Sequence, residues 1–248
     1  MIPIIDVKGL SVTYQTGGRP VVDDVSFMVT EGSTLGIIGE SGAGKTTLAL
    51  ALSGLIDHAM AMVTGTITYA GHDLLNLDEA SLCRLRGAGI SMIFQDASGS
   101  LDPSMPVVDQ VTEAVALHQQ TGDKSDALKL AQRILNETGL DAHLLAAAPY
   151  AHQLSGGLCQ RAMIAAAIAC QPKVLVADEP TSSLDVITQS QIVSLIDKQQ
   201  RDLWLTLIFI SHDLAIVSNI SAQLLVMQEG RVVDLRPTAE TACGQHPT

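Results

Sequence analysis

The stretch TLGIIGESGAGKTTLALALSGL, residues 34–55, decides the fold. It begins with a short apolar run, passes through a glycine-rich turn at residues 39–46, and continues into a segment rich in leucine and alanine. This order predicts a buried strand, a tight loop and a helix. Glycines allow backbone N–H groups to converge on a phosphate, and the start of a helix adds a partial positive charge. The spacing of the glycines, followed at once by lysine and threonine, therefore predicts a phosphate-binding loop.

The loop predicts a nucleotide site that includes a magnesium ion. Lys45 is expected to reach the β- and γ-phosphates of ATP, and the Thr46 hydroxyl is expected to be a ligand of Mg²⁺. A glycine turn before a buried helix, the simpler interpretation, does not require lysine and threonine at this offset. The predicted cofactor-binding residues of this segment are Gly39, Glu40, Ser41, Gly42, Ala43, Gly44, Lys45, Thr46 and Thr47.

Two adjacent carboxylates follow a buried strand later in the chain. The apolar run VLVAD, residues 174–178, ends in Asp178, and Glu179 comes next. Phosphoryl transfer uses a carboxylate near the metal and a group that activates the nucleophile, so we expect Asp178 on the metal side and Glu179 as general base. Side chains alternate along a strand, but Pro180 favours a strand that ends here, so both can face the site. An acidic loop after a strand is common on its own, and is the weaker interpretation beside a phosphate loop.

Polar residues end two further apolar runs. Gln95 follows ISMIF at residues 90–94, and His212 follows LTLIFIS at residues 205–211. Ligands of open α/β sheets bind at the carboxyl ends of the strands, so both residues are candidates for the same site. Taken singly, each is equally consistent with a solvated strand end.

Apolar β-branched runs alternate with segments of helical period, which predicts an α/β fold. The predicted strands are 4–14, 25–29, 34–38, 65–69, 90–94, 174–178, 205–211 and 223–228. The early strands lie close together in the sequence and are expected to form an antiparallel sheet beside a mainly parallel one.

Between Asp96 and Leu154 no strand is predicted. Residues 107–120 and 124–138 in this stretch carry apolar side chains at helical spacing, which predicts an all-helical insert. The length suits one domain with such an insert better than two independent domains. The predicted organisation is a single domain, 1–248, with a catalytic core at 1–95 and 155–235, the helical insert at 96–154 and a short tail at 236–248.

The composition argues against several classes of protein. Hydrophobic residues make up 47 %, yet the apolar run at residues 162–170 is far shorter than the stretch needed to cross a bilayer. The N-terminus lacks the features of a secretion signal, so we expect a cytoplasmic chain. A net charge of −12 with 14 Lys and Arg argues against binding nucleic acid. Four scattered cysteines without a CxxC pair predict neither a metal site nor a disulfide framework.

A second glycine turn, HQLSGGLCQR at residues 152–161, has no lysine. Glycines at a helix start expose N–H groups and Ser155 adds a hydroxyl, so Ser155, Gly156 and Gly157 can hold a phosphate without one. A helix cap followed by close packing remains a fair alternative for this segment alone. Because the first loop already surrounds the β-phosphate, we favour a turn that serves the nucleotide held by a second chain.

Together these residues resemble the ABC-type ATPase family over nearly the whole chain. The resemblance rests on the Walker A motif Gly39–Thr46, the Q-loop Gln95, the signature Leu154-Ser155-Gly156-Gly157, the Walker B residues Asp178 and Glu179, the D-loop Ser182-Ser183-Leu184-Asp185, the switch histidine His212 and the A-loop residue Tyr14. It implies a P-loop NTPase fold with a mixed core sheet, an N-terminal antiparallel β subdomain and an α-helical insert.

The resemblance also implies a head-to-tail dimer that closes over two ATP molecules with Mg²⁺. Each ATP would lie between the phosphate loop of one chain and the signature turn of the other. Glu179 would be the catalytic base, His212 would contact the γ-phosphate, and Gln95 would have a catalytic and metal-binding role. Tyr14 would stack on adenine, although it is equally consistent with edge-strand packing, and Asp185 would carry contacts across the interface.

Two stretches, residues 94–115 and 150–186, resemble the dipeptide, oligopeptide and nickel importer branch of the family. The chain departs from the family at Leu158, where glutamine is common. The expected function is that of an ATPase subunit on the cytoplasmic face of the membrane, which drives peptide uptake through a separate permease. Nickel or metal-chelate uptake is the alternative, and a soluble ATPase that acts on nucleic acid or ribosomes is a remote one.

The expected partners are the permease, a second ATPase subunit that is identical or different, and, indirectly, an external solute-binding protein, with no nucleic acid. A small-molecule kinase, a third interpretation, leaves Ser155-Gly156-Gly157 and His212 without a role. The segment GQHPT at residues 244–248 resembles the point where peptide importer subunits continue into a segment with a cysteine cluster. The chain is therefore either a short member or a truncated one.

Overall fold

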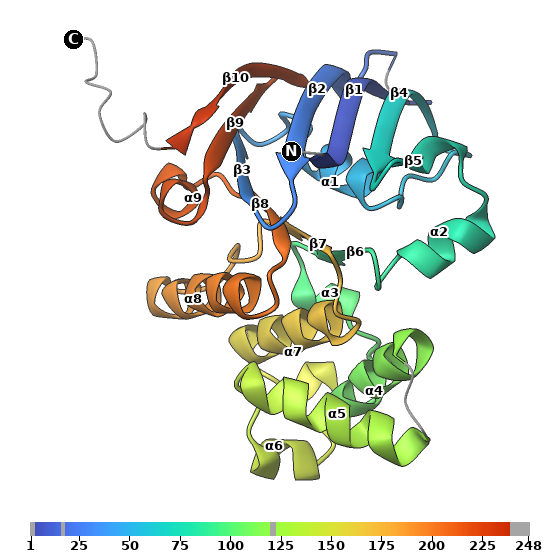
Figure 1. Ribbon diagram of the computed structural model, residues 1–248. Helices are drawn as coiled ribbons and strands as arrows, with labels where there is room; N and C mark the ends of the chain where they lie inside the picture. Colours follow the sequence, from blue (N-terminus) through green and yellow to red (C-terminus); the bar gives the residue numbers. More distant parts are fainter. Residues whose placement is uncertain (1–2, 16–17, 120–122, 239–248) are drawn as a thin grey trace. The chain divides into compact units, whose positions relative to one another are not determined.

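The computed structural model describes residues 3–15, 18–119 and 123–238 (Figure 1). The segment GQHPT lies outside the described residues. By its internal contacts the chain divides into a first unit and a second unit. The first unit comprises residues 1–83, 176–178 and 205–248, and the second comprises residues 84–175 and 179–204. The domain bounds expected from the sequence follow a different division and stay a prediction.

The first unit holds all strands of one sheet, most strands of the other and two of the helices that pack on them. Its elements are β1 (Pro3–Tyr14), β2 (Val22–Thr30), β3 (Thr34–Gly39), α1 (Lys45–Leu52), β4 (Ala61–Tyr69), β5 (His72–Asp73), the 3₁₀ turn η1 (Leu74–Asn76), β8 (Thr206–Ile210), α9 (Leu214–Ile220), β9 (Gln223–Gln228) and β10 (Arg231–Pro237). Helix α2 (Glu79–Leu85) and strand β7 (Val174–Asp178) each cross from one unit to the other along the chain.

The smaller sheet has the strand order β2-β1-β4-β5, and its neighbouring strands are antiparallel (Figure 1). The burial pattern of β2 shows why this segment forms a strand of the sheet. Val25, Phe27 and Val29 are buried, while the intervening Ser26 and Met28 are exposed. This period of two is typical of a strand with one face on the core and one in water. The expected antiparallel sheet of early strands is confirmed for β1, β2 and β4, whereas β3 belongs to the larger sheet.

The larger sheet has the strand order β10-β9-β3-β8-β7-β6. Strand β3 pairs in parallel with β8 and β9, and β10 is antiparallel to β9. Strand β8 is buried at every residue, as expected for a parallel strand covered on both faces. The strand β10 was not predicted from the sequence, and neither was the short β5.

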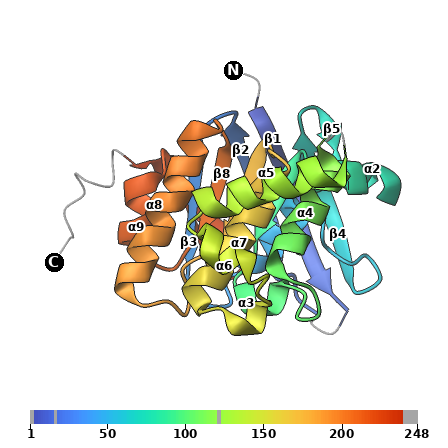
Figure 2. The same cartoon turned by 90° about the horizontal axis from the view of Figure 1, so that it is seen from below.

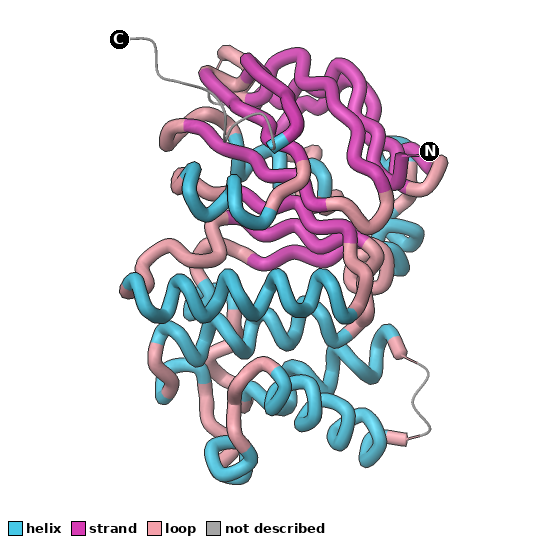
Figure 3. The backbone as a smooth tube through the Cα atoms, turned by 60° about the vertical axis from the view of Figure 1, so that its left-hand side comes forward, coloured by secondary structure: helices cyan, strands magenta, loops and turns pink. Residues whose placement is uncertain are grey.

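The second unit is mainly helical, as the colours of Figure 3 show for the segment between β6 and β7. Its elements are β6 (Ile90–Ile93), α3 (Ala97–Ser100), α4 (Val107–His118), α5 (Lys124–Glu137), α6 (Ala142–Ala146), the 3₁₀ turn η2 (Ala151–Gln153), α7 (Gly156–Ala169) and α8 (Val186–Asp202). Helices α4, α5 and α7 pack against one another (Figure 2). The predicted all-helical character of this segment is confirmed, and two of its predicted helices match α4 and α5.

Helices α4 and α5 of the second unit bury one apolar stripe each. Val107, Val111 and Val115 of α4 recur every four residues and are fully buried, as are Ala131 and Leu135 of α5. This spacing places them on one face of each helix, which explains why the two helices pack as a pair. No helix among the described residues is long and apolar enough to span a bilayer.

Candidate functional site

The glycine-rich loop joins β3 to α1 in the first unit. Strand β3 ends at Gly39 and helix α1 begins at Lys45, so the loop lies at the carboxyl end of a buried parallel strand. The N–H of Ala43 donates to the Glu40 carbonyl at 3.1 Å, which closes a turn inside the loop. Gly44 has φ 95°, and a Cβ there would overlap the Val21 carbonyl oxygen. A side chain at this position would therefore distort the loop.

Lys45 is nearly buried although it carries a charge, with 5 % of its surface exposed. Its Nζ donates to the carbonyl oxygens of Gly39 at 2.8 Å and of Glu40 at 3.0 Å. A buried ammonium group must be compensated by hydrogen bonds, and the loop supplies them from its own backbone. The result is a positive charge held inside a turn of backbone amides, which is an arrangement that suits an anion.

Two of the predicted residues lie at, or just after, the carboxyl ends of other strands in the sheet that contains β3. The N–H of Ser211, just after β8, donates to the Ile37 carbonyl of β3 at 3.1 Å, and the exposed His212 follows. Asp178 is the last residue of β7, the strand next to β8, and is 1 % exposed. The loop and His212 thus lie at the carboxyl ends of paired parallel strands, the usual position of ligands in such sheets.

The oxygen donors of the first unit fit a magnesium ion. Thr46, the second residue of α1, is exposed and carries a hydroxyl group, and Asp178 carries a carboxylate. Mg²⁺ takes oxygen ligands and is usually held by one or two carboxylates together with phosphates and water. Within the described part of the chain, no group of three or more His, Cys, Asp or Glu could hold a metal ion. The donor set therefore suits an ion that arrives with a phosphate better than an ion held by protein alone.

Tyr14 is the last residue of β1 and is partly exposed. The residues that line a hollow of 520 Å³ together with Tyr14 include Thr13 of β1, His58, and Ala61, Met62 and Val63 of β4. An aromatic ring at the edge of such a hollow can stack on a planar group. The hollow is compatible with the adenine-stacking role that the family resemblance implies, and that role stays a prediction.

Gln95 and Glu179 lie together in the second unit. The Gln95 Nε2 donates to the Glu179 carboxylate at 3.3 Å, and the hydroxyl of Ser182 donates to the Gln95 carbonyl at 3.3 Å. Glu179 has φ 44°, a left-handed conformation that is uncommon for a residue with a side chain. Strand β7 has ended one residue earlier, as the position of Pro180 predicts. Residues in such conformations cluster at functional sites.

The second glycine turn begins α7, a helix of 14 residues. Ser155 is its N-cap, and the Ser155 hydroxyl accepts the N–H of Leu158 at 3.4 Å. Ser155 and Gly156 are both exposed. The capping interpretation is thus correct in geometry, and it leaves the N-terminal amides of a long helix at the surface, where an anion can reach them.

Asp185 caps α8 in the same unit. Its Oδ1 accepts the N–H groups of Ile187 and Thr188 at 3.1 and 3.0 Å, and its Oδ2 accepts the Thr188 hydroxyl at 2.6 Å. The Thr188 hydroxyl, followed by the backbone amides, holds the pKa of Asp185 below its usual value. Gly157 faces the Thr188 side chain, so the signature turn and the start of α8 are in contact. The expected contact of Asp185 across a dimer interface stays a prediction.

Comparison with known proteins gives the family. The model of the family described as ABC transporter matches residues 22–182, more than half of the chain. The chain belongs to the ABC transporter family. It is 42 % identical to the oligopeptide transport ATP-binding protein OppD of Haemophilus influenzae over all of this chain and 76 % of that protein. It is 41 % identical to the dipeptide transport ATP-binding protein DppD of Escherichia coli over 93 % of this chain and 71 % of that protein.

Solved structures of ABC cassettes share the fold. The dimeric structure of MJ0796, a bacterial ABC transporter cassette, matches with a TM-score of 0.84 and 25 % identity over 94 % of this chain and 98 % of that chain. The structure of cbiO1 from Clostridium perfringens, part of the ABC transporter complex cbiONQ, matches with a TM-score of 0.81 and 27 % identity over 98 % of this chain and 92 % of that chain. The predicted fold class, the resemblance to an ABC-type ATPase and the nucleotide-hydrolysing activity are confirmed at the level of the family.

This ABC ATPase has a further support of the phosphate loop that the sequence analysis missed. The turn between β9 and β10 contacts the loop, because the N–H of Gly230 donates to the Ala43 carbonyl at 3.2 Å. The missed signal was Glu229-Gly230 between two short β-type runs, a pair of residues that favours a tight hairpin turn. In the second run, Arg231–Pro237, exposed residues alternate with partly exposed ones and none is buried, so no buried apolar run in the sequence predicts β10 or its turn.

Proposed function

We propose that the chain is the ATP-binding and hydrolysing subunit of an importer that takes up oligopeptides or dipeptides through a separate permease. The observation that supports this most directly is the 41–42 % identity to oligopeptide and dipeptide transport ATP-binding proteins over 93–100 % of the chain. The subunit would bind at the cytoplasmic face of the membrane, attached through the permease. An external solute-binding protein would deliver the peptide.

The phosphate loop would hold the triphosphate. Its backbone amides would surround the β-phosphate, and Lys45, which is already fixed by two loop carbonyls, would exchange one or both of these contacts for phosphate oxygens. Thr46, Asp178 and Gln95 would supply oxygen ligands to Mg²⁺. When bound, the ion neutralises charge that develops on the phosphate oxygens.

Glu179 would accept the proton of the attacking water. The hydrogen bond from the Gln95 amide to its carboxylate at 3.3 Å supports this role, because it orients the group that must take the proton. The left-handed backbone at Glu179 turns its side chain away from the alternation of β7. His212 would stabilise the γ-phosphate as a hydrogen-bond donor.

The nucleotide would be completed by a second ATPase subunit. Ser155, Gly156 and Gly157 of that subunit would present their N–H groups and a hydroxyl to the γ-phosphate, while Asp185 would contact the facing chain. The exposure of Ser155 and Gly156 at the start of α7 supports this arrangement. ABC cassettes of the same fold have been solved as dimers.

Transport assays test the proposal. A strain that lacks the gene is complemented with the wild type or with Lys45→Ala, and uptake of a labelled dipeptide, a labelled tripeptide and ⁶³Ni²⁺ is measured. We expect the wild type, and not the variant, to restore peptide uptake, and a tagged wild-type chain to co-purify with a membrane permease. Restoration of nickel uptake without peptide uptake would show that the substrate is a metal. Co-purification with ribosomes or nucleic acid, without a permease, would contradict transport altogether.

A further inference from the structure

We infer that Asp23 and Arg231, the Asp23–Arg231 pair, position the phosphate loop for nucleotide through the β9–β10 turn. Both residues lie outside the loop, in β2 and β10, and neither belongs to a motif on which the resemblance to the family rests. The inference rests on the assignment of residues 39–46 as the phosphate loop. It adds to that assignment a pair of residues that sets the geometry of the loop without touching the nucleotide.

The β9–β10 turn is bonded to the phosphate loop on one side and to β2 on the other. The N–H of Gly230 donates to the Ala43 carbonyl of the loop at 3.2 Å, and the Gly230 carbonyl accepts the N–H of Asp23 at 2.8 Å. A single residue of the turn therefore links the loop to the strand. A shift of the turn would move the Ala43 carbonyl, and with it the peptide plane that carries the Gly44 amide.

Close packing leaves the turn little room. Glu229 and Gly230 have φ 47° and 83°, which are the left-handed conformations of a tight hairpin turn. A Cβ on Gly230 would lie 2.6 Å from the Val21 carbonyl oxygen, the same oxygen that Gly44 of the loop approaches. The turn, the start of β2 and the loop thus meet around one peptide group.

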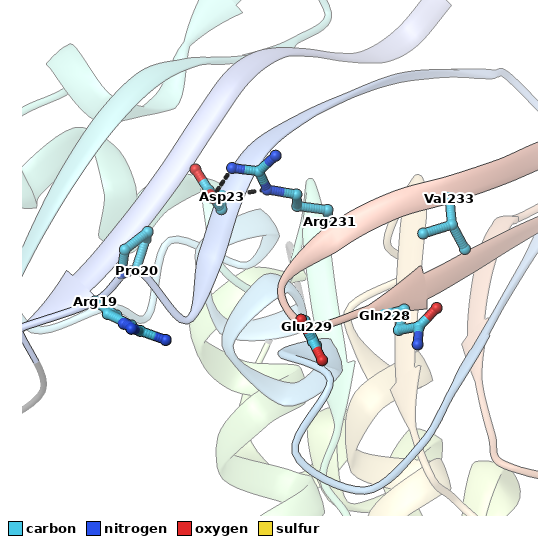
Figure 4. A pocket seen from close by; sticks show the side chains of 7 residues that line it. All are labelled: Arg19, Pro20, Asp23, Gln228, Glu229, Arg231 and Val233. Atoms are coloured by element: carbon cyan, nitrogen blue, oxygen red, sulfur yellow. Dashed lines mark hydrogen bonds and ion pairs between the residues drawn. The ribbon is translucent and has the colours of Figure 1, made fainter.

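The Asp23–Arg231 pair holds the end of this turn (Figure 4). Arg231 follows Gly230 directly, and its Nε and Nη2 donate to Oδ2 of Asp23 at 2.8 and 2.6 Å. Asp23 is also the residue whose backbone N–H bonds to Gly230. The backbone of Asp23 therefore bonds to Gly230 and its side chain to the next residue, Arg231. Two bonds at consecutive residues restrict the rotation of the turn as well as its distance from β2.

Solvent reaches the pair. The side chains of Arg231 and Asp23 are 67 % and 28 % exposed, and they line an open pocket of 660 Å³. The other charged groups that face this pocket are Arg19, before β2, and Glu229 of the turn. Exposed ion pairs contribute little to the stability of a fold and weaken as salt rises. Removal of the pair should therefore leave the protein folded and change the position of the turn.

The consequence concerns nucleotide affinity more than the chemical step. Backbone amides bind phosphate only when they converge on it, so a displaced Ala43 peptide should weaken the ground-state and transition-state complexes alike. Such a uniform loss raises KM and leaves kcat nearly unchanged. KM for ATP should therefore rise in a variant that lacks the pair. It should also rise in the wild type at high ionic strength, because salt screens the ion pair.

The test compares Arg231→Gln with two control variants in which another ion pair is lost. Arg236→Gln removes a contact to Asp234 at 3.3 Å on the same strand, and Arg201→Gln removes an equally exposed pair with Asp197 on α8. We expect Arg231→Gln to raise KM for ATP, and the Kd of a fluorescent ATP analogue, about three- to tenfold with kcat within about twofold. Both controls should keep the wild-type values.

A charge exchange separates positioning from damage to the fold. The double variant Asp23→Arg, Arg231→Asp should recover at least half of the lost affinity, and NaCl should raise the wild-type Kd towards that of Arg231→Gln while it changes the variant less. Equal Kd values for the wild type and Arg231→Gln, or no recovery in the double variant, would overturn the inference. Lys45→Ala, measured alongside, keeps the two assignments apart. If Lys45→Ala bound nucleotide normally, the assignment of residues 39–46 as the phosphate loop would be wrong. If Lys45→Ala lost nucleotide binding while Arg231→Gln bound normally, only the role of the Asp23–Arg231 pair would be wrong.

Discussion

At the scale of single residues, two side chains of the site have unusual surroundings or backbone conformations. Lys45 is buried and compensated by carbonyls, and Glu179 is held in a left-handed backbone beside Gln95. Both residues were predicted from sequence spacing, because Lys45 directly follows a glycine loop and Glu179 follows a buried strand in a chain that contains such a loop. The conformations of these residues could not be predicted from the sequence. The φ of Glu179 depends on a turn in which the N–H of Ser182 donates to the Glu179 carbonyl at 3.0 Å.

Glu179→Gln tests the role of the base. The amide cannot accept the proton of water, so kcat should fall by about 10²- to 10⁴-fold, the range attributed to a positioned base. ATP binding should persist, because the side chain is not part of the phosphate loop. Turnover by rapid phosphate release and binding by a fluorescent analogue measure the two effects, with the exposed Glu137→Gln on α5 as control. If Glu179→Gln hydrolysed ATP at the wild-type rate, Glu179 could not be the general base.

At the scale of elements, the sequence predicted what depends on apolar periodicity and missed what depends on tertiary contacts. Strands such as β3 and β8 are continuous apolar runs, and α4 and α5 show helical spacing, so these elements were visible in the sequence. Strand β10 exposes alternate residues, including Val233 and Leu235, and lies at the edge of its sheet. Its pairing with β9, and the contact of their turn with the phosphate loop, come from long-range packing that no local pattern records.

The packing of α5 gives a prediction at this scale. Leu135 is fully buried, whereas Leu117 on α4 is 73 % exposed. Leu135→Ala should lower the free energy of unfolding by about 2–5 kcal/mol, through lost burial and the cavity left behind. Leu117→Ala should change it by less than about 0.5 kcal/mol. Urea unfolding followed by circular dichroism measures both, and a similar cost for the two variants would contradict the assignment of the buried stripe.

The cap of α8 predicts a pH dependence. The pKa of Asp185 is lowered from 3.8 by the Thr188 hydroxyl and by backbone amides, so its charged form is favoured by folding. This contribution is present at neutral pH and is lost as the pH falls through the lowered pKa. Asp185→Ala should therefore lower the Tm at pH 7, and the difference from the wild type should shrink below pH 3.8. Asp202→Ala, at the other end of α8, serves as control. A difference that stays constant with pH would contradict the role of the carboxylate.

At the scale of the whole molecule, the proposed nucleotide site requires two chains. Family membership identifies an ABC-type ATPase, and the separate pieces of the site are each in a form that can bind phosphate: the loop with Lys45 in the first unit and the exposed turn at Ser155 in the second. The sequence alone favoured a second turn that serves the nucleotide of another chain, because the first loop already surrounds the β-phosphate, and the resemblance to the family added the head-to-tail arrangement of the two chains. The composition of a site shared between chains cannot be read from the periodicity of one chain, because no local pattern records which surface faces a partner.

The central claim is that each ATP binds to the phosphate loop of one chain and to the signature turn of another. Mixing two inactive variants tests it most directly. Lys45→Ala and Ser155→Arg chains carry different tags, and the mixed dimer is purified through both tags in the presence of ATP. A dimer of either variant alone should be inactive. The Lys45→Ala dimer has no functional phosphate loop, and the Ser155→Arg dimer has no functional signature turn. The mixed dimer contains one intact loop facing one intact turn, so it should regain about half of the wild-type ATPase rate if the sites act independently. A purified mixed dimer that remains as inactive as its parents, or a Ser155→Arg chain that is fully active alone, would contradict the shared site.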